Sequence, residues 1–238
     1  MQKNTLISVI IPVYNQAEEI QQSLHSLLTQ SHKNYEVIVV NDGSTDSTAK
    51  VLDEMKKIFW QRGIRFKSIQ QSNRGSNHAR NRGREESRGE FIIFWDSDIV
   101  AASELLEKLL NALRENPEAS YAYSSFIFGK KKFKLWEFNP EKLKQLPYIH
   151  SSSLIRKDHF PPNGWDARVK RLQDWDVWLT MLENGYKGVW VPEFLFTVLT
   201  KHGTMSVWLP KYVYKVPWLS EVKKYKKAVE VIKKKHKL

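Results

Sequence analysis

The sequence predicts an α/β domain built on a mostly parallel sheet with helices on its faces. Short apolar stretches rich in β-branched residues alternate with amphipathic stretches along residues 1–115. Such alternation is typical of parallel strands joined by right-handed helical crossovers. Polar residues follow several of these strands directly. The ends of parallel strands meet at one edge of the sheet, and ligands bind at that edge.

The first half of the chain contains four expected strand–helix pairs. The first strand, 7–15, is a buried β-branched run closed by Pro and Asn, and the helix at 17–31 spaces its large apolar residues at i, i+4, i+7 and i+8. The helix at 44–59 has Ser44 or Thr45 as its cap. The remaining elements are strands at 35–44, 64–70 and 90–96 and helices at 75–87 and 102–116.

The second half is less regular in its pattern. A basic, aromatic connector separates two of its expected strands, and a helix around Val177 ends at Gly185. The expected strands are at 121–128, 148–157 and 187–192, with the connector at 129–147. The expected organisation is one domain at 1–210, made of halves 1–100 and 101–210, followed by a basic helical tail at 211–238.

The composition excludes several classes of site. The chain has no cysteine, which excludes disulfides, thiolate metal sites and cysteine nucleophiles and fits a reducing compartment. No apolar run approaches the roughly 20 residues needed to span a bilayer. Pro12 interrupts the short N-terminal run, so a signal peptide is not expected. We therefore expect a cytoplasmic protein that is either soluble or peripheral to a membrane.

The net charge of +12 is concentrated at the C-terminus. Residues 211–238 hold ten Lys and two Glu, so the preceding 210 residues carry only +4. The basic character therefore does not predict a nucleic-acid-binding fold. Leu219, Val222, Val229 and Ile232 can form one apolar stripe among the lysines. This pattern fits either an anionic membrane surface or a helix packed on the domain.

Two carboxylates, Asp96 and Asp98, end the strand at 90–96 and stand on either side of Ser97. Hard carboxylate oxygens suit Mg²⁺ or Mn²⁺, which then bridge the oxygens of a diphosphate. A solvated acidic turn is the alternative, and an Asp-x-Asp triplet alone does not exclude it. The ends of the neighbouring strands therefore decide between the two interpretations.

Polar residues also end the other strands of this edge. Asp42 can accept hydrogen bonds from a base or ribose, and Gly43 permits a tight turn before Ser44. An ordinary turn with a helix cap would use the same residues. PVYN after the first strand can supply backbone contacts and a ring for a nucleobase. Arg74, Arg80 and Arg82 follow near the same edge, where an arginine can pair with phosphate oxygens in a forked geometry, although most of them are expected to be surface charges.

Five motifs follow one another along the chain: SVIIPVYNQAEEIQQSLHSLLTQS, YEVIVVNDGSTDST, NRGSNHARNRG, GEFIIFWDSDIV and LQDWDVWLTMLENGY. In this order and at these distances they resemble the family-2 inverting glycosyltransferases of the GT-A fold. The resemblance covers about residues 5–205. It implies a Rossmann-like, mostly parallel sheet that binds a nucleotide-sugar, and an irregular second half that binds the acceptor.

The resemblance implies a role for each matching position. The implied donor-binding residues are Pro12, Val13, Tyr14, Asn15, Asp42, Gly43, Ser44, Arg80, Asp96 and Ser97. Asp98 would be the principal metal ligand, with Asp96 and, by a looser match, His202 beside it. Asp174 would be the catalytic base, and Gln173 stands where many relatives have Glu.

The chemistry is consistent with these roles but leaves alternatives open. Inversion by direct displacement needs one base to take the proton of the acceptor hydroxyl. Asp174 could instead cap a helix, and Asp176 is close enough to be an alternative base. The implied acceptor-side residues are His150, Ser151, Ser152 and Trp175. Polar residues of an edge strand are the alternative for the histidine and serines.

The sequence therefore predicts a metal-dependent, inverting glycosyltransferase that uses Mn²⁺ or Mg²⁺. The expected donor is a UDP-sugar and the expected acceptor is a glycan or a lipid-linked saccharide, with no nucleic acid as partner. A nucleotidyltransferase would need a Gly/Arg/Lys-rich phosphate loop, which PVYNQAEE lacks. An inactive nucleotide-sugar-binding relative would not need Asp98 and Asp174. A basic module that binds nucleic acid or membrane through the tail alone is the third competitor.

Overall fold

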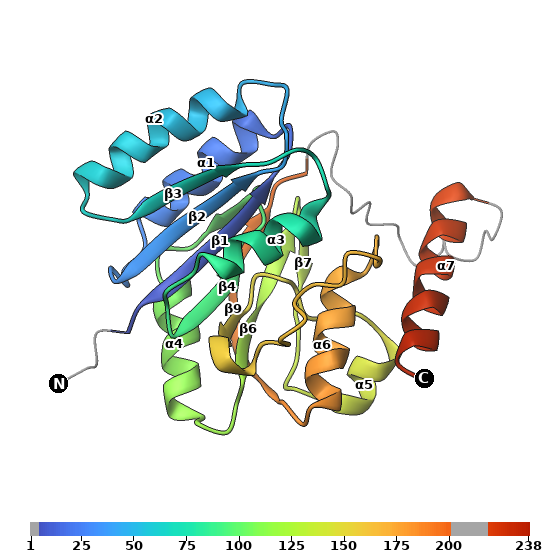
Figure 1. The fold of residues 1–238 in the computed structure, drawn as a ribbon. Coiled ribbons are helices and arrows are strands. Elements are labelled where there is room, and N and C mark those ends of the chain that lie inside the picture. Colours follow the sequence, from blue (N-terminus) through green and yellow to red (C-terminus); the bar gives the residue numbers. More distant parts are fainter. Residues whose placement is uncertain (1–4, 201–218) are drawn as a thin grey trace.

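The computed structural model describes residues 5–200 and 219–238 as one sheet between two layers of helices (Figure 1). The strands are β1 (Ile7–Val13), β2 (Tyr35–Asn41), β3 (Phe66–Gln70), β4 (Phe91–Phe94), β5 (Ile99–Ala101), β6 (Tyr121–Phe128), β7 (Lys131–Phe133), β8 (Leu154–Arg156) and β9 (Gly188–Val198). The helices are α1 (Ala17–Leu28), α2 (Thr48–Gln61), α3 (Ser76–Glu85), α4 (Leu105–Glu115), α5 (Pro140–Gln145), α6 (Gln173–Glu183) and α7 (Ser220–Lys235), with a short 3-10 turn, η1 (Lys157–His159).

The strands of the first half are parallel, as the sequence predicts. The order in the sheet is β3-β2-β1-β4-β8-β6-β9-β5, and β7 pairs with β6. β1 lies parallel to both β2 and β4, and β2 lies parallel to β3. The carboxyl ends of β1, β2 and β4 therefore meet at one edge of the sheet.

The second half is more regular than the sequence indicated, because its strands continue the same sheet. β8 runs antiparallel to β4 and β6, and β9 runs parallel to β6 and antiparallel to β5. The strand expected at 187–192 extends over Gly188–Val198, whereas the one expected at 148–157 shortens to Leu154–Arg156. The connector expected at 129–147 contains β7 and α5.

The core has two parts, one on each face of the sheet. One part joins the sheet to α1, α2 and α4 through residues such as Leu24, Met55 and Leu109. The other part joins it to α5, α6 and α7 and is rich in aromatic residues, among them Trp175 and Trp178. α3 lies on this second face, where Gly83 packs directly against Ile10 and leaves no room for a β-carbon.

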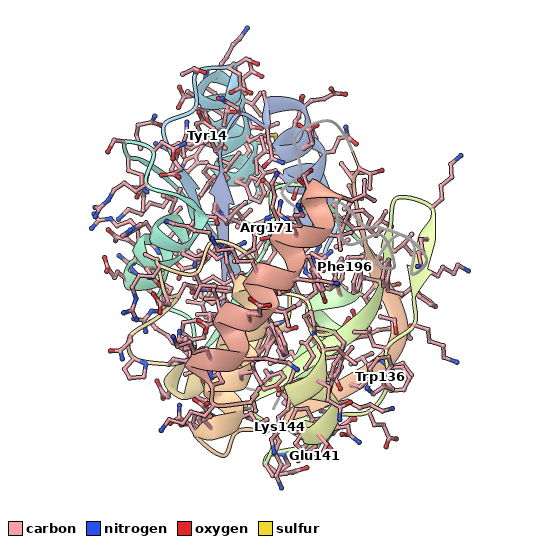
Figure 2. All side chains as sticks on the ribbon, turned by 90° about the vertical axis from the view of Figure 1, so that its right-hand side faces the viewer. Tyr14, Trp136, Glu141, Lys144, Arg171 and Phe196 are labelled. Atoms are coloured by element: carbon pink, nitrogen blue, oxygen red, sulfur yellow. The ribbon has the colours of Figure 1, made fainter. Side chains whose placement is uncertain are left out.

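The C-terminal helix α7 packs on the domain with its apolar side inward. Val222 and Ile232 have 0% exposure, and Val229 packs against the same core. Figure 2 shows α7 lying across this side of the molecule, next to Arg171, which pairs with Glu221 at 2.9 Å. Of the two alternatives for the apolar stripe, a membrane surface or a helix packed on the domain, the packed helix therefore holds for these three residues. In the part of the chain that the structure describes, no helix is long and apolar enough to cross a membrane.

Candidate active site

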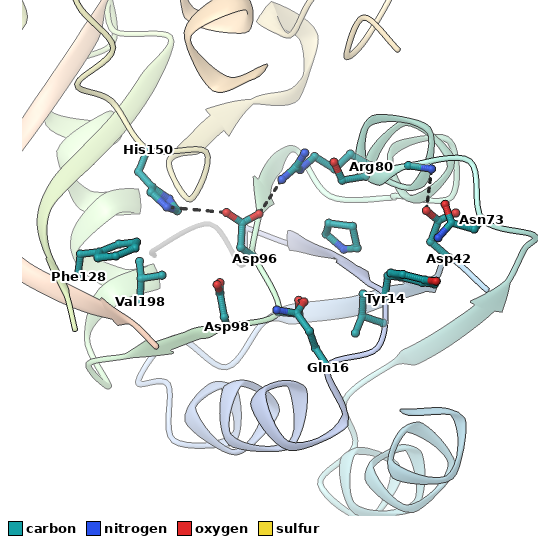
Figure 3. Close-up of a pocket in the computed structure, with 15 residues that line it drawn as sticks. Tyr14, Gln16, Asp42, Asn73, Arg80, Asp96, Asp98, Phe128, His150 and Val198 are labelled. Carbon is teal, nitrogen blue, oxygen red and sulfur yellow. Dashed lines mark hydrogen bonds and ion pairs between the residues drawn. The ribbon is translucent and has the colours of Figure 1, made fainter. Parts of the chain in front are cut away.

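A cavity of about 360 Å³ lies at the carboxyl ends of β1, β2 and β4 (Figure 3). Both halves of the chain line it. The lining residues are Pro12, Val13, Tyr14, Gln16, Asp42, Asn73, Gly75, Ser76, Arg80, Asp96, Ser97, Asp98, Phe128, His150 and Val198. Seven of the ten donor residues implied by the resemblance therefore line one cavity.

Asp42 is fixed at the end of β2 by the loop that follows β3. Its carboxylate accepts hydrogen bonds from Gln71 Nε2 at 2.7 Å and from the backbone N–H groups of Arg74 and Gly75 at 2.9 and 2.8 Å. The side chain is 3% exposed. A carboxylate has about four acceptor positions, so one remains for a donor group of a ligand.

Asn15, Gly43 and Ser44 do not line the cavity but tie its two loops together. The Asn15 backbone N–H donates to Ser44 Oγ at 2.9 Å, and the Thr45 N–H donates to Asn15 Oδ1 at 2.7 Å. Gly43 has φ +78°, and a β-carbon there would press on the Asn73 backbone. These three residues shape the cavity without lining it.

Arg80 and Asp96 form the central ion pair of the cavity. Arg80 Nη2 donates to Asp96 Oδ1 at 2.8 Å, and Ser151 Oγ donates to Asp96 Oδ2 at 2.8 Å. Figure 3 shows Asp96 joined to Arg80 on one side and to His150 on the other. Burial alone would raise the pKa of Asp96, but Arg80, His150 and these hydrogen bonds outweigh it and hold that pKa below its usual value.

Asp98 differs from Asp96 in its surroundings. Among the described residues, no side chain donates a hydrogen bond to its carboxylate, and its backbone C=O accepts from the Leu199 N–H at 2.8 Å. Burial, and next the Asp96 charge, raise the pKa of Asp98 to about 7. A group with these surroundings has open coordination positions and an unfavourable negative charge, which a bound cation offsets.

The residues around Asp98 fit a Mg²⁺ or Mn²⁺ ion that takes some of its ligands from the protein and the others from a diphosphate. The described residues contain no cluster of three or more His, Cys, Asp or Glu that could hold a metal by itself. Mg²⁺ commonly binds through one or two carboxylates together with substrate phosphates. Asp98 and Asp96 supply such a pair. His202, the third implied ligand, lies outside the described residues.

His150 lines the cavity, whereas the two serines that follow it bind Asp96 and the Phe94 carbonyl without lining it. The His150 ring lies between Phe126 and Phe196, with centroid distances of 5.2 and 5.1 Å. Its Nδ1 accepts from the Ser152 N–H at 3.1 Å, so Nε2 faces Asp96 at 3.8 Å. Ser152 Oγ donates to the Phe94 carbonyl and is buried, so it is part of the scaffold.

Asp174 lies in the first turn of α6, which is held against α3. Gln173, the preceding residue, accepts hydrogen bonds from Arg80 Nη1 at 3.0 Å and from Ser76 Oγ at 3.1 Å. Burial raises the pKa of Asp174, and His150, Asp96 and Arg80 all influence it electrostatically. A carboxylate with a raised pKa, close to the cavity charges, suits a general base.

Two further expectations for α6 change in the structure. Trp175 has 0% exposure, and its Nε1 donates to the Leu143 carbonyl at 2.6 Å, so its ring belongs to the core and cannot contact an acceptor. Asp176 points away from the cavity and binds Lys235 and His236. It is therefore not available as an alternative base.

Several lining residues were not predicted from the sequence. Gln16 accepts a hydrogen bond from Ser97 Oγ and directly follows PVYN, so its position could have indicated a role. Asn73 and Gly75 follow β3, which is a third strand end at the same edge. Phe128 and Val198 come from β6 and β9, and no local signal places them at the cavity.

A family model described as Glycosyl transferase family 2 matches residues 8–167. The chain is 36% identical over 151 residues to an uncharacterized glycosyltransferase of Rickettsia bellii, covering 63% of this chain and 20% of that protein. It is 28% identical over 203 residues to an uncharacterized glycosyltransferase of Methanocaldococcus jannaschii, covering 80% of this chain and 69% of that protein. The chain therefore spans only about a fifth of the Rickettsia relative.

Solved structures share the fold at low sequence identity. S. aureus TarS 1–349 in complex with UDP-GlcNAc superposes with a TM-score of 0.71 at 21% identity, covering 88% of this chain and 64% of that one. The mannosyltransferase PcManGT from Pyrobaculum calidifontis, in complex with GDP-Man and Mn²⁺, gives 0.70 at 19% identity, covering 85% and 59%. These matches show the GT-A arrangement of an α/β sheet flanked by helices.

Proposed function

The chain belongs to glycosyl transferase family 2, and from this premise we propose that it transfers a sugar, with inversion, from a nucleoside diphosphate to a hydroxyl of a glycan or a lipid-linked saccharide. The observation that carries the proposal is the pairing of Asp96 with Arg80 while the adjacent Asp98 carboxylate stays open. One carboxylate is neutralised by the protein, and the other is left for the metal and diphosphate of a donor.

In this proposal the donor nucleoside lies against the ends of β1 and β2. Tyr14 is 46% exposed at the cavity and offers a ring face for a base. Asp42 offers its remaining acceptor position to a ring N–H or a ribose hydroxyl. We propose uracil as the base, since TarS, which shares this fold, is solved with UDP and with UDP-GlcNAc. PcManGT, solved with GDP-Man, makes GDP the comparison to test.

The proposed metal would be held by Asp98, with Asp96 as its neighbour. When bound, Mn²⁺ or Mg²⁺ would act as a Lewis acid that offsets the negative charge on the departing nucleoside diphosphate. Arg80 supplies a fixed positive charge at the same place and orients Asp96. His150 Nε2 faces this cluster from the opposite side and can donate a hydrogen bond to a phosphate or sugar oxygen.

Asp174 is the proposed base of the reaction. It would accept the proton of the acceptor hydroxyl as that oxygen attacks the anomeric carbon from the side opposite the leaving diphosphate. The bond to the diphosphate breaks as the new glycosidic bond forms, so the configuration inverts. Gln173 fixes the start of α6 to Arg80 and thereby holds the base relative to the donor cavity.

The first experiment is thermal unfolding of the chain with UDP, GDP, CDP and dTDP, each with and without Mn²⁺. A ligand that binds only the native state raises the unfolding midpoint. We expect a Mn²⁺-dependent rise with UDP that the Asp98→Ala variant loses. Asp53→Ala, an exposed change on α2, is the matched control and should keep the rise.

The outcomes separate the proposed function from its alternatives. A rise in the unfolding midpoint with GDP alone would change the proposed donor to a GDP-sugar, and the proposed class of reaction would stay the same. A rise with UDP, but no UDP release from any UDP-sugar in the presence of acceptor extracts, would favour an inactive nucleotide-sugar-binding relative. No rise with any nucleotide at millimolar concentration would contradict the donor site.

The acceptor and the membrane contact form the last part of the proposal. α7 turns its apolar side inward and leaves Lys223, Lys227 and Lys234 exposed on its outer side. We propose that this lysine face holds the protein electrostatically at an anionic membrane surface, without insertion of the helix. Such a contact would bring the cavity close to a lipid-linked saccharide.

A further inference from the structure

The end of α7 and helix α6 are joined by a network of charges in which Asp176 and His236 are buried and Lys235 and Glu183 reach them from the surface. Asp176 is 3% exposed, and its two oxygens bind His236 Nε2 at 2.9 Å and Lys235 Nζ at 2.8 Å. The second ring nitrogen of His236 binds Glu183 Oε1 at 2.8 Å. We call Asp176, Glu183, Lys235 and His236 the α6–α7 clasp. In the Asp176–His236 pair both side chains are buried, so removing one of them would leave the other uncompensated. This pair therefore holds the two helices together more strongly than the partly exposed contacts of Lys235 and Glu183.

The clasp also holds the loop that enters α6. Lys235 Nζ binds Asp166 Oδ2 at 2.9 Å, and the Asp166 carbonyl accepts a hydrogen bond from Asn77 Nδ2 at 2.7 Å. Asn77 Oδ1 in turn accepts from Arg80 Nη1 at 3.2 Å. A continuous series of hydrogen bonds therefore runs from the end of α7, through the loop, to the arginine that pairs with Asp96.

The backbone at the start of α6 is strained and needs such support. Leu172, directly before Gln173 and Asp174, has φ +57° and ψ +37°, a left-handed conformation that favours glycine. The helix has no side-chain cap at this position. A non-glycine residue in this region costs roughly 1–3 kcal/mol and persists only where its surroundings impose it. The Asp176 N–H donates to the Leu172 carbonyl at 3.1 Å, and Lys235 binds the side chains of Asp176 and of Asp166, which precedes Leu172.

We propose that Lys235 and His236 are positioning residues of the active site: by clasping Asp166 and Asp176 they impose the strained entry to α6 and hold Asp174 and Gln173 in place. The C-terminal helix is then part of the catalytic scaffold. The inference deepens the proposed function and rests on it for the role of Asp174. The geometry of the clasp does not depend on which sugar is transferred.

The first test is hydrogen–deuterium exchange of the full chain by mass spectrometry, which needs no substrate. Lys235→Met keeps the apolar stem of the side chain and removes the charge, and His236→Gln removes the double ion pair. Lys226→Met, an exposed lysine of the same helix, is the matched control. Well below the unfolding midpoint, we expect amides of residues 166–176 to exchange about tenfold faster in the two clasp variants. Peptides from β1 and β2 should not change.

The second test is turnover of the nucleotide-sugar identified in the nucleotide screen, measured as release of the nucleoside diphosphate. We expect kcat to fall about tenfold in Lys235→Met while KM for the donor stays within about twofold, because the donor cavity itself is untouched. Lys235→Arg, which retains the charge, should recover most of kcat. A purely structural helix would lower the unfolding midpoint and leave kcat unchanged below it.

The two tests can contradict different parts of the proposal. Unchanged exchange over residues 166–176 in both clasp variants would overturn the positioning role, whatever the enzyme does. Faster exchange with unchanged kcat would overturn the link to Asp174. A donor screen that finds no nucleotide would instead contradict the proposed function, and the exchange result would still decide whether the clasp holds the loop.

Discussion

At the scale of single residues, the two carboxylates of the Asp-x-Asp pair differ because their neighbours differ. Asp96 faces Arg80, Ser151 and His150, which stabilise its charged form. Asp98, two residues away, has burial and the Asp96 charge acting against ionisation, and its pKa rises to about 7. In the proposed function, Asp96 therefore belongs to the fixed scaffold and Asp98 is the group that would change its partners when a donor and metal bind.

Replacing Asp174 by Asn should lower turnover strongly and leave donor binding intact. The amide cannot accept the proton of the acceptor, and general-base contributions are typically about 10²–10⁴-fold in rate. We therefore expect kcat to fall within that range, while the Mn²⁺-dependent rise in unfolding midpoint with UDP remains. Asp53→Asn is the control. An equal loss of binding and turnover would place Asp174 in the donor site instead.

Asp98 should destabilise the metal-free protein at neutral and alkaline pH. Its folded pKa of about 7 lies above its ordinary value of 3.8, so the folded state binds more protons between those values. The free energy of unfolding then falls as pH rises through this window. In EDTA at pH 8, Asp98→Asn should raise the unfolding midpoint by on the order of 5 °C. The gain should shrink toward pH 4, and a gain independent of pH would contradict this assignment.

At the scale of helices and strands, the two helices that carry Arg80 and Asp174 are held in place by contacts with other parts of the fold. α3 carries Arg80 and packs on β1 through Gly83, where any larger residue would meet Ile10. α6 carries Asp174 and is fixed at its start by Gln173 and along its length by α7. The site therefore depends on three helices that are distant in sequence.

The contribution of His236 to stability should disappear in alkaline solution. Burial would lower the pKa of His236, but its hydrogen bonds to Asp176 and Glu183 outweigh this and raise the pKa above 6.5. A raised folded pKa gives stability that is fully present below the unfolded pKa and is lost as pH rises through the folded one. Two further charged groups lie next to this pair: Lys235, which binds the Asp176 carboxylate, and Asp166, which binds Lys235.

The measurement is thermal unfolding of wild type and His236→Gln from pH 5.5 to 9.5. At pH 6 the variant should unfold about 3–6 °C lower. The difference should narrow steadily as the pH passes the folded pKa of the imidazole. A difference that stays constant or widens toward pH 9 would show that His236 acts as a neutral side chain in the clasp.

At the scale of the whole molecule, the charge is polarised. The chain carries +12, and its C-terminal 28 residues contribute eight of these charges. The apolar side chains of α7, together with Lys235 and His236, contact the domain, and the outer lysines are left for solvent or a partner. Screened surface attraction, and not insertion, is what this arrangement permits.

The lysine face should bind anionic vesicles in a salt-dependent manner. We expect the chain to sediment with vesicles of phosphatidylglycerol and phosphatidylcholine at low ionic strength and to dissociate near 0.5 M NaCl, where the screening length is about 4–5 Å. Exchanging Lys223, Lys227 and Lys234 for Glu should abolish sedimentation. Vesicles of phosphatidylcholine alone should not bind either protein.

The control for this prediction makes the same change in charge elsewhere. α2 carries Lys50, Lys56 and Lys57, all exposed, and their exchange for Glu should leave vesicle binding nearly intact. Equal loss in both triple variants would show that net charge, and not the α7 face, governs the contact. Binding that resists salt would point to insertion of apolar residues, contrary to the docked position of Val222 and Ile232.

The sequence by itself determined the parallel half of the sheet and the edge at which its polar residues meet. Buried strands and amphipathic helices have local periodicities, and each strand end carries its own polar residues, so Asp42, Asp96 and Asp98 could be assigned to one edge from the chain order. Arg80 was singled out by the family resemblance. The family motifs extend over the same segments.

Only the tertiary structure decided which side chains face the cavity and which are covered. Trp175 and Asp176 follow Asp174 directly, yet one is buried in the core and the other binds α7, because a helix sends neighbouring residues about 100° apart. An apolar stripe among lysines fits a membrane and a protein core equally well, so the sequence could not choose for α7. The α6–α7 clasp, with its buried Asp176–His236 pair between residues 60 positions apart, made that choice.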